Sequence, residues 1–186
     1  MDFQELVVTR RTVHQYKTDK IDDEPVLKAL ELGLWAPNHK MTWPWRYYWL
    51  GPLARRKLAD LAVELKSAKE SEPMSEVKVA ATRSNVLNPS HFILLGLAKT
   101  PEAHRHHENY ATLACSVQIM SMYLWDQGIA TKWSTGGFTT HAKTYEVIGA
   151  SADEVQLEGG LMIGVPATMP AVPARPSLGE FLQRLE

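Results

Sequence analysis

The chain has 186 residues, a length that suits one compact domain. Hydrophobic residues make up 45% and charged residues 22%, so the chain can bury a core without disulfides or metals. The formal net charge of -1 gives no indication of nucleic-acid or membrane binding, and the single cysteine, Cys115, excludes an internal disulfide. The first residues do not have a signal-peptide pattern, and no apolar stretch of about 18 residues is present. We expect a cytoplasmic protein with one domain over residues 1–186.

The first half of the chain predicts three helices and a strand. Capping residues or a proline in the first turn mark the helix starts, and a run of aromatic residues marks the strand. The expected elements are a helix over 2–9, a helix from 22 or 23 to 36, a strand over 45–50, a helix from 51, and a mobile, partly helical excursion over 67–88.

The second half predicts three further strands around one long helix. Apolar residues surround almost the whole circumference of that helix, so we expect it to be buried on most sides. The expected elements are a strand over 91–97, the long helix over 110–126, a strand over 129–134, a helix over 140–148, a strand over 157–165, an extended arm over 166–176 and a helix over 177–185. The long helix argues against a repeating βαβ fold.

Four segments carry residue types that bind small anionic or aromatic ligands. Arginine pairs with phosphate through two parallel hydrogen bonds, proline-rich loops hold polar groups rigidly, and small residues let a ligand approach the backbone. The segments are Arg10-Arg11-Thr12, the loop 36–46, the strand end 132–137, and Arg175 on the arm. Taken singly, each is also compatible with an ordinary solvated turn, a locally packed loop or a surface residue.

Two other features of the sequence are weaker indications of a functional site. The run His104-Arg105-His106-His107 lacks further ligands at zinc-site spacing, so we interpret it as a solvated loop rather than a metal site. Cys115 falls within the long helix, where we expect it in the core rather than acting as a reactive thiol. Neither a serine-hydrolase elbow nor a phosphate-binding glycine loop is present in the sequence.

In combination, the four segments resemble the nitroreductase family. The shared features are an Arg-Arg-Thr sequence after a first short helix, the loop Ala36-Pro37-Asn38-His39-Lys40 followed by Pro44-Trp45, a central helix ended by Gly128, and a late strand ending in Gly164-Val165-Pro166. The resemblance runs nearly end to end. The loop and Trp133-Ser134-Thr135-Gly136 look most like the small, single-domain NAD(P)H nitroreductase branch.

This resemblance implies an α+β fold, with a mainly antiparallel central sheet flanked by helices, and an intertwined homodimer that binds FMN at the subunit interface. It implies that Arg10, Arg11 and Thr12 hold the phosphate and ribityl end, with Arg175 adding charge. It places His39 at the flavin of the partner subunit, with Trp35 near the same shared surface. The residues that line the isoalloxazine ring would be Trp133, Ser134 and Thr135.

The chain departs from the family pattern at two positions. Trp43 stands where the family often has Gln, so Thr42 or Lys40 is a candidate for the missing contact with the pyrimidine edge. His14 stands where the family often has a further Arg, which weakens the grip on the ribityl-phosphate. Trp35 replaces a cation found in the small branch, and it either stacks on the ring or closes the substrate pocket.

The resemblance also implies the reaction. NAD(P)H, the co-substrate, delivers hydride to flavin N5, and a nitroaromatic or quinone acceptor takes the electrons in a ping-pong cycle, so no catalytic side chain is assigned. His39 and Lys40 are candidates to stabilise negative charge near N1. The alternatives are an O2-dependent oxidation or reductive dehalogenation on the same fold, or a flavin-binding protein without enzymatic activity.

Overall fold

A four-stranded antiparallel sheet organises the computed structural model, which describes residues 1–185. The strand order is β1-β2-β4-β3, and every neighbouring pair runs antiparallel. The strands are β1 (Trp45–Trp49), β2 (His91–Ala98), β3 (Ala130–Ser134) and β4 (Val155–Gly164). All four were predicted from their apolar or aromatic runs, and the α+β, mainly antiparallel fold is confirmed.

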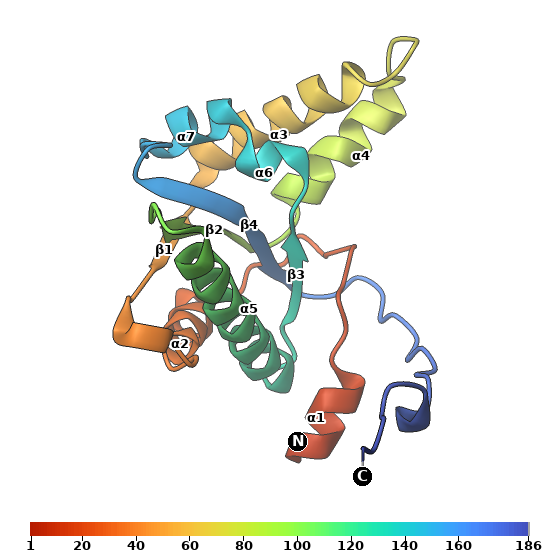
Figure 1. Cartoon of the computed structure of the whole chain (residues 1–186). Helices are drawn as coiled ribbons and strands as arrows, with labels where there is room; N and C mark the ends of the chain where they lie inside the picture. The colour runs from red at the N-terminus through yellow and green to blue at the C-terminus, as the bar shows by residue number, and fades with distance from the viewer. Residues whose placement is uncertain (186) are drawn as a thin grey trace.

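Helices cover both faces of this sheet. In Figure 1, α5 and α2 lie on one face, and the pair α3–α4 with α6 and α7 lies on the other. The helices are α1 (Phe3–Thr9), α2 (Asp23–Gly33), α3 (Pro52–Ser67), α4 (Glu76–Leu87), α5 (Ala103–Asp126), α6 (Gly137–Thr140) and α7 (Ala142–Ile148), with short 3₁₀ turns η1 (His39–Met41) and η2 (Leu178–Glu180).

The two central strands divide the core in two. Phe92 and Leu94 of β2 pack with α3 and α4, whereas Ile93, Leu95 and Leu97 pack with α2 and α5. This alternation follows from the two-residue period of a strand, and because both faces are covered, β2 is apolar almost throughout. A register shift between Leu95 and Gly96 interrupts the pairing of β2 with β4.

The buried Arg55 of α3 ties the end of α4 to the start of β2. Its guanidinium donates to the backbone carbonyls of Val86 (3.0 Å), Leu87 (2.8 Å) and Ser90 (2.9 Å), and also to that of Pro89. These carbonyls have no helical partner because α4 ends at Leu87. Arg55 therefore satisfies a helix end that the fold buries.

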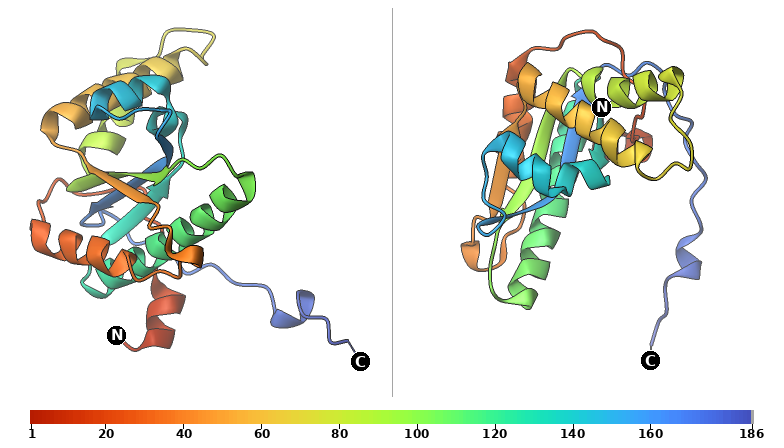
Figure 2. Two further views of the ribbon diagram at one scale, coloured as in Figure 1. Left: turned by 60° about the vertical axis from the view of Figure 1, so that its left-hand side comes forward. Right: turned by 90° about the horizontal axis from the view of Figure 1, so that it is seen from above.

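The two ends of the chain extend from this body. Helix α1 has no buried residue, and the segment after Pro166 runs away from the sheet (Figure 2). The capping box of Ser177 and Glu180 forms as predicted, but it opens only the 3₁₀ turn η2 instead of a helix over 177–185. Leu178, Phe181 and Leu185 are exposed in the single chain, so no packing surface stabilises a longer helix there.

Helix α5 differs most from its prediction. It begins at Ala103, seven residues early, so the run 104–107 forms its first turns instead of a solvated loop. It buries one face only, and Cys115 is exposed on the opposite face; the predictions of a mostly buried helix and a core cysteine were wrong for the single chain. The pattern of apolar residues alone could not separate a surface that faces this chain's core from one that faces solvent or a partner.

Two other predictions need correction. The segment 67–88, predicted as a partly helical excursion, forms the connection and the second helix of the α3–α4 hairpin: α3 ends at Ser67, and the Ser75 hydroxyl caps α4 by accepting the Lys78 N–H. The helix predicted over 140–148 is split in two, and His141 rather than Thr140 caps α7, its Nδ1 accepting the Lys143 N–H at 3.2 Å.

A candidate ligand-binding cleft beside β3

The segment after α1 lies along the free edge of β3. Thr12 forms a parallel bridge with Thr131, and the Val13 N–H donates to the Thr131 carbonyl at 3.2 Å. Arg11 is buried, and its guanidinium donates to the carbonyls of Val8 and Arg10. Arg11 thus caps the end of α1 and is not free to hold a ligand phosphate, whereas Thr12 is exposed.

Arginines from the two ends of the chain converge here. Burial lowers the pKa of Arg10, and the positive charges of Arg11 and Arg175 lower it further. Arg175 is therefore within electrostatic reach of Arg10, although 164 positions separate them in the sequence. Neither guanidinium forms an ion pair with any residue among 1–185. Their charges are available to an anion.

A cavity of about 470 Å³ opens between β3 and the α3–α4 hairpin. Its polar lining comes from these three elements and from His141 at the start of α7, and no aspartate or glutamate contributes to it. The polar lining residues are Lys66, Lys69, Thr82, Asn85, Lys132, Ser134 and His141. Asn85 also lines a second cavity of about 330 Å³ that contains His14. These two cavities, which share Asn85, are together called the cleft, and Lys66, Lys69 and Lys132 make its larger part cationic.

The sequence did not indicate Thr82 or Asn85 as site residues. Both lie in the segment taken as a mobile excursion, and each faces the cleft only because α4 folds back on α3. A spacing of three residues places polar side chains on one face of a helix, and this was the available signal.

The predicted ring-lining residues separate onto two faces of the sheet. Ser134 faces the cleft, and Thr135 is exposed just beyond it. Trp133 lies on the α5 side, where its Nε1 donates to the Glu158 carbonyl at 3.3 Å and its ring lies 6.0 Å from that of Tyr110. Trp133 is therefore held by the fold, with Ser134 and Thr135 on the cleft side.

Glu158 is a partly buried carboxylate next to this tryptophan. Burial raises its pKa, whereas the positive charge of His106, whose Nε2 lies 3.3 Å from the carboxylate, lowers it. The following residue, Gly159, has φ +124°, and a Cβ there would come within 2.4 Å of the Ser134 carbonyl. Only glycine fits this close approach of β4 to the end of β3.

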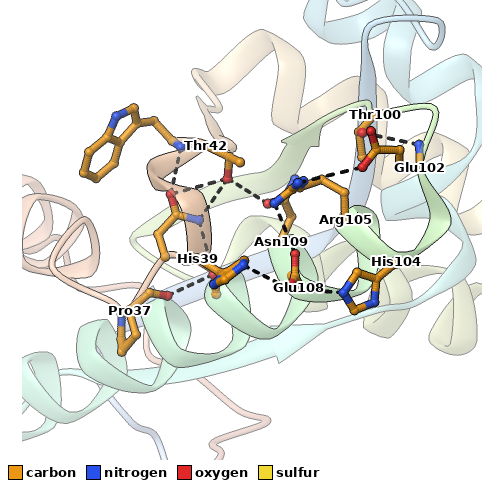
Figure 3. Close-up of polar contacts among 12 residues, drawn as sticks. Pro37, His39, Thr42, Thr100, Glu102, His104, Arg105, Glu108 and Asn109 are labelled. Carbon is orange, nitrogen blue, oxygen red and sulfur yellow. Dashed lines mark hydrogen bonds and ion pairs between the residues drawn. The ribbon is translucent and has the colours of Figure 1, made fainter.

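The loop between α2 and β1 is held in an unusual conformation. Lys40, Met41 and Trp43 all have positive φ, which costs about 1 kcal/mol or more for each non-glycine residue. Hydrogen bonds to α5 compensate: Thr42 donates to the buried Asn109 at 2.8 Å, and Thr112 donates to the Pro37 carbonyl at 2.9 Å. Figure 3 shows this network. The loop is thereby rigid before any ligand binds.

This rigid loop presents several side chains to solvent. His39 lies 3.7 Å from Glu108, whose carboxylate also contacts His104 and Arg105 at 3.3 Å each (Figure 3). Trp35 is 84% exposed. Lys40 is also exposed and forms no ion pair with the described residues.

The structure does not bring this loop to the cleft of the same chain. Thr9, at the end of α1, accepts a hydrogen bond from Trp125 near the end of α5, whereas the loop contacts Asn109 and Thr112. At 1.5 Å per residue, the two contact points lie about 20 Å apart along the helix. Trp35, His39 and Lys40 therefore lie apart from Arg10, Thr12 and Arg175.

Comparisons with known proteins agree with this architecture. The family model described as the nitroreductase family matches residues 7–165. YfhC of Bacillus subtilis (strain 168), provisionally named an NAD(P)H nitroreductase, is 20% identical over 92% of this chain and 88% of its own. A nitroreductase-like family protein from Bacillus cereus is 22% identical with a TM-score of 0.82, covering 100% of this chain and 97% of that one.

A solved structure with ligands named in its description shares the fold as well. The FMN-dependent nitroreductase NfnB from Mycobacterium smegmatis, in complex with NADPH, is 17% identical with a TM-score of 0.77 and covers 98% of this chain and 97% of its own. The fold and cleft define an α+β protein with a cationic site at a sheet edge. Because the family model spans most of its length, the chain belongs to the nitroreductase family.

Proposed function

We propose that this chain is an FMN-dependent oxidoreductase that transfers electrons from NAD(P)H to nitroaromatic, quinone or similar electron-poor acceptors. The observation that carries the proposal is the convergence of Arg10 and Arg175, two guanidiniums without acidic partners among residues 1–185, next to the segment that bridges the edge of β3. Strand β3 also lines a cavity without carboxylates. Two such cations suit a phosphate dianion, and the rest of the cleft suits a flat polar ring. We take residues 1–186 as a single domain.

The residues present fit FMN. Arg10, Thr12 and Arg175 would hold the phosphate and ribityl end, and His14 lies beside them at the adjoining cavity. Ser134 and Thr135 would line the ring at the end of β3, supported from behind by Trp133. Arg11 contributes positive charge, but through its position rather than its hydrogen bonds, because its guanidinium binds backbone carbonyls.

A second copy of the chain completes the proposed site. Trp35, His39 and Lys40 face solvent about 20 Å along α5 from the phosphate end, so only the partner's loop can reach the flavin. The exposed stripe of α5, formed by His107, Ala111, Cys115 and Gln118 at helical spacing, suits close packing against the same stripe of a second copy. The proposed homodimer would also cover apolar side chains of α1 and the arm: Phe3, Val7, Val8, Met169, Val172, Leu178, Phe181 and Leu182.

The chain's own part in the reaction is to bind and orient. Bound FMN would supply the redox chemistry, taking hydride at N5 from NAD(P)H and passing electrons to the acceptor in a ping-pong cycle. The fixed loop 37–43 would present His39 and Lys40 to the flavin of the partner and leave Trp35 to stack on a planar ligand. No side chain of the cleft is required to carry a proton, since solvent reaches Thr135.

The first test is spectroscopic. Purified protein incubated with FMN should show the absorbance of oxidised flavin, and anaerobic NADH or NADPH should bleach it. A nitroaromatic compound or quinone should then restore the oxidised spectrum with turnover. Bleaching without re-oxidation by either acceptor would favour an O2-dependent reaction or a dehalogenation, and failure to bind FMN would overturn the proposal.

A second test addresses the shared site. One variant, Arg10→Met with Arg175→Met, loses the phosphate contacts, and another, His39→Ala with Lys40→Ala, loses the loop contacts. If two copies share each site, unfolding and refolding the variants together gives mixed dimers with one intact site, and part of the activity returns. Sites built from a single chain would show no recovery in the mixture.

A further inference from the structure

Lys132 lies at the floor of the cleft, two residues before Ser134. The two side chains project from the same face of β3, because strand residues alternate with a period of two, and both line the 470 Å³ cavity. Lys132 is half-buried, and burial lowers the pKa of its ammonium. Lys66 and Lys69, which line the same cavity, are exposed at its rim.

No acceptor satisfies this ammonium group. Its side chain makes no hydrogen bond or ion pair with any residue among 1–185. Two of its polar cavity neighbours, Lys66 and Lys69, are cations, and the others, Thr82, Asn85, Ser134 and His141, carry no acidic group. The acids nearest in sequence to the rim are engaged elsewhere, since Glu64 binds Lys143 and Glu70 binds Lys78. A half-buried cation without a counter-charge is unfavourable unless a ligand supplies the anion.

We propose that Lys132 stabilises the negative charge that FMN acquires near N1 and C2=O on reduction. This rests on the proposed function and replaces His39 and Lys40 as the principal cation for that role. Lys132 reaches the cleft from the same chain and from a strand, whereas those two residues arrive on the partner's loop. A cation on a rigid strand keeps its position through both half-reactions.

The phosphate is the less suitable partner for Lys132. Arg10 and Arg175 already supply two unpaired guanidiniums for it, beyond the free edge of β3. Lys132 instead shares its cavity with Thr82 and Asn85 of α4, which carry a hydroxyl and an amide. Such neutral donors and acceptors match the alternating N–H and C=O groups of a pyrimidine edge better than they match a dianion.

The test uses FMN-loaded protein and three variants. Lys132→Met removes the charge at similar volume, Lys132→Arg keeps it, and Lys99→Met removes an exposed lysine beyond the end of β2 as a matched control. Dissociation constants are measured for FMN and riboflavin in the oxidised state and, after anaerobic reduction, in the reduced state. Lys132→Gln provides a second neutral variant, and circular dichroism checks that each variant is folded.

We expect Lys132→Met and Lys132→Gln to weaken the binding of reduced FMN about tenfold more than the binding of oxidised FMN. For a two-electron couple this corresponds to a midpoint potential about 30 mV more negative. With riboflavin, the two neutral variants should show the same difference. Lys132→Arg should keep most of the wild-type preference for the reduced flavin, and Lys99→Met should leave that preference unchanged.

Other results overturn the inference. Equal weakening of both oxidation states, or an effect confined to FMN and absent with riboflavin, would place Lys132 at the phosphate. An unchanged potential would show that it does not face the ring. In these cases the wild-type protein still binds FMN and is reduced by NAD(P)H, so the proposed function stands; wild-type protein that binds no flavin would overturn both.

Discussion

Arg55 is buried and Lys132 is half-buried on the same side of the sheet, and their surroundings differ. Arg55 donates to four backbone carbonyls between α4 and β2. Lys132 has no acceptor among residues 1–185, although it directly precedes the predicted site residue Trp133 and lies two positions before Ser134. A buried cation that satisfies carbonyls is part of the framework, whereas one without acceptors is available to a ligand. The same contrast separates Arg11 from Arg10.

The largest effect is expected for Arg55→Met. The variant leaves buried carbonyls without donors, and we expect the free energy of unfolding to fall by about 3–5 kcal/mol. Urea denaturation of the protein without flavin measures it. The neighbouring exposed Arg56→Met should change it by less than about 0.5 kcal/mol. If Arg55→Met lowered the free energy of unfolding by less than about 1 kcal/mol, water would be able to replace the guanidinium. The contrast between Arg55 and Lys132 would then fail.

The pair Arg11→Met and Arg10→Met tests the contrast within one dipeptide. Arg11→Met should lower the free energy of unfolding by about 1–3 kcal/mol, because the carbonyls of Val8 and Arg10 lose their donor. Arg10→Met should weaken FMN binding about 10- to 100-fold and change stability little, since its charge serves the phosphate. Flavin fluorescence titration and denaturation of each variant distinguish the two roles. If the two variants changed FMN affinity and the free energy of unfolding equally, the distinction between Arg10 and Arg11 would be contradicted.

Glu158 extends the comparison to a buried anion. Its pKa is raised, so between the ordinary value of 4.5 and that raised value the folded chain binds more protons than the unfolded chain. Stability contributed by this group therefore falls as pH rises through that window. Glu158→Gln should abolish this fall of stability, which amounts to less than about 1 kcal/mol. Thermal unfolding of both proteins, followed from pH 4 to 8, measures it. A wild-type curve parallel to that of the variant would show that His106 offsets the burial completely.

The smallest effect is expected for Lys132→Met in the protein without flavin. Removing an unpaired, half-buried charge should raise the free energy of unfolding, by less than about 1 kcal/mol because solvent screens the ammonium. The lowered pKa means that the folded chain loses its proton first, so wild-type stability rises as pH increases toward 10.5. The advantage of the variant should therefore shrink over that range. Destabilisation at neutral pH would indicate an acceptor for Lys132 in the fold itself.

The sequence predicted the sheet well because its strands are marked by apolar or aromatic runs. The predicted start of α5 was seven residues too late because His104–His107 are polar. Their partners Glu108 and Glu158 become apparent only in three dimensions. Cys115 was placed in the core because apolar residues occur almost all round the predicted helix, and that pattern looks the same whether this chain or another covers them.

Site residues show the same division. Arg10, Thr12 and Arg175 could be selected from their residue types, and the structure places them near one another. Arg11 could not be separated from Arg10, because only the positions of nearby carbonyls distinguish them. The place of Asn85 in the cleft and the enclosure of Lys132 depend on how the α3–α4 hairpin closes over β3, which no local pattern encodes.

The arm that carries Arg175 has one further consequence. Arg175 and Arg10 repel each other, and the segment between Pro166 and η2 has no regular secondary structure to resist that repulsion. An anion between them reverses the sign of the interaction, so the arm should behave as an electrostatic latch. Trypsin, which does not cleave the Arg175–Pro176 bond, would then cleave after Arg184 more slowly when inorganic phosphate or FMN is added, which makes limited digestion a simple measure of how tightly the arm is held.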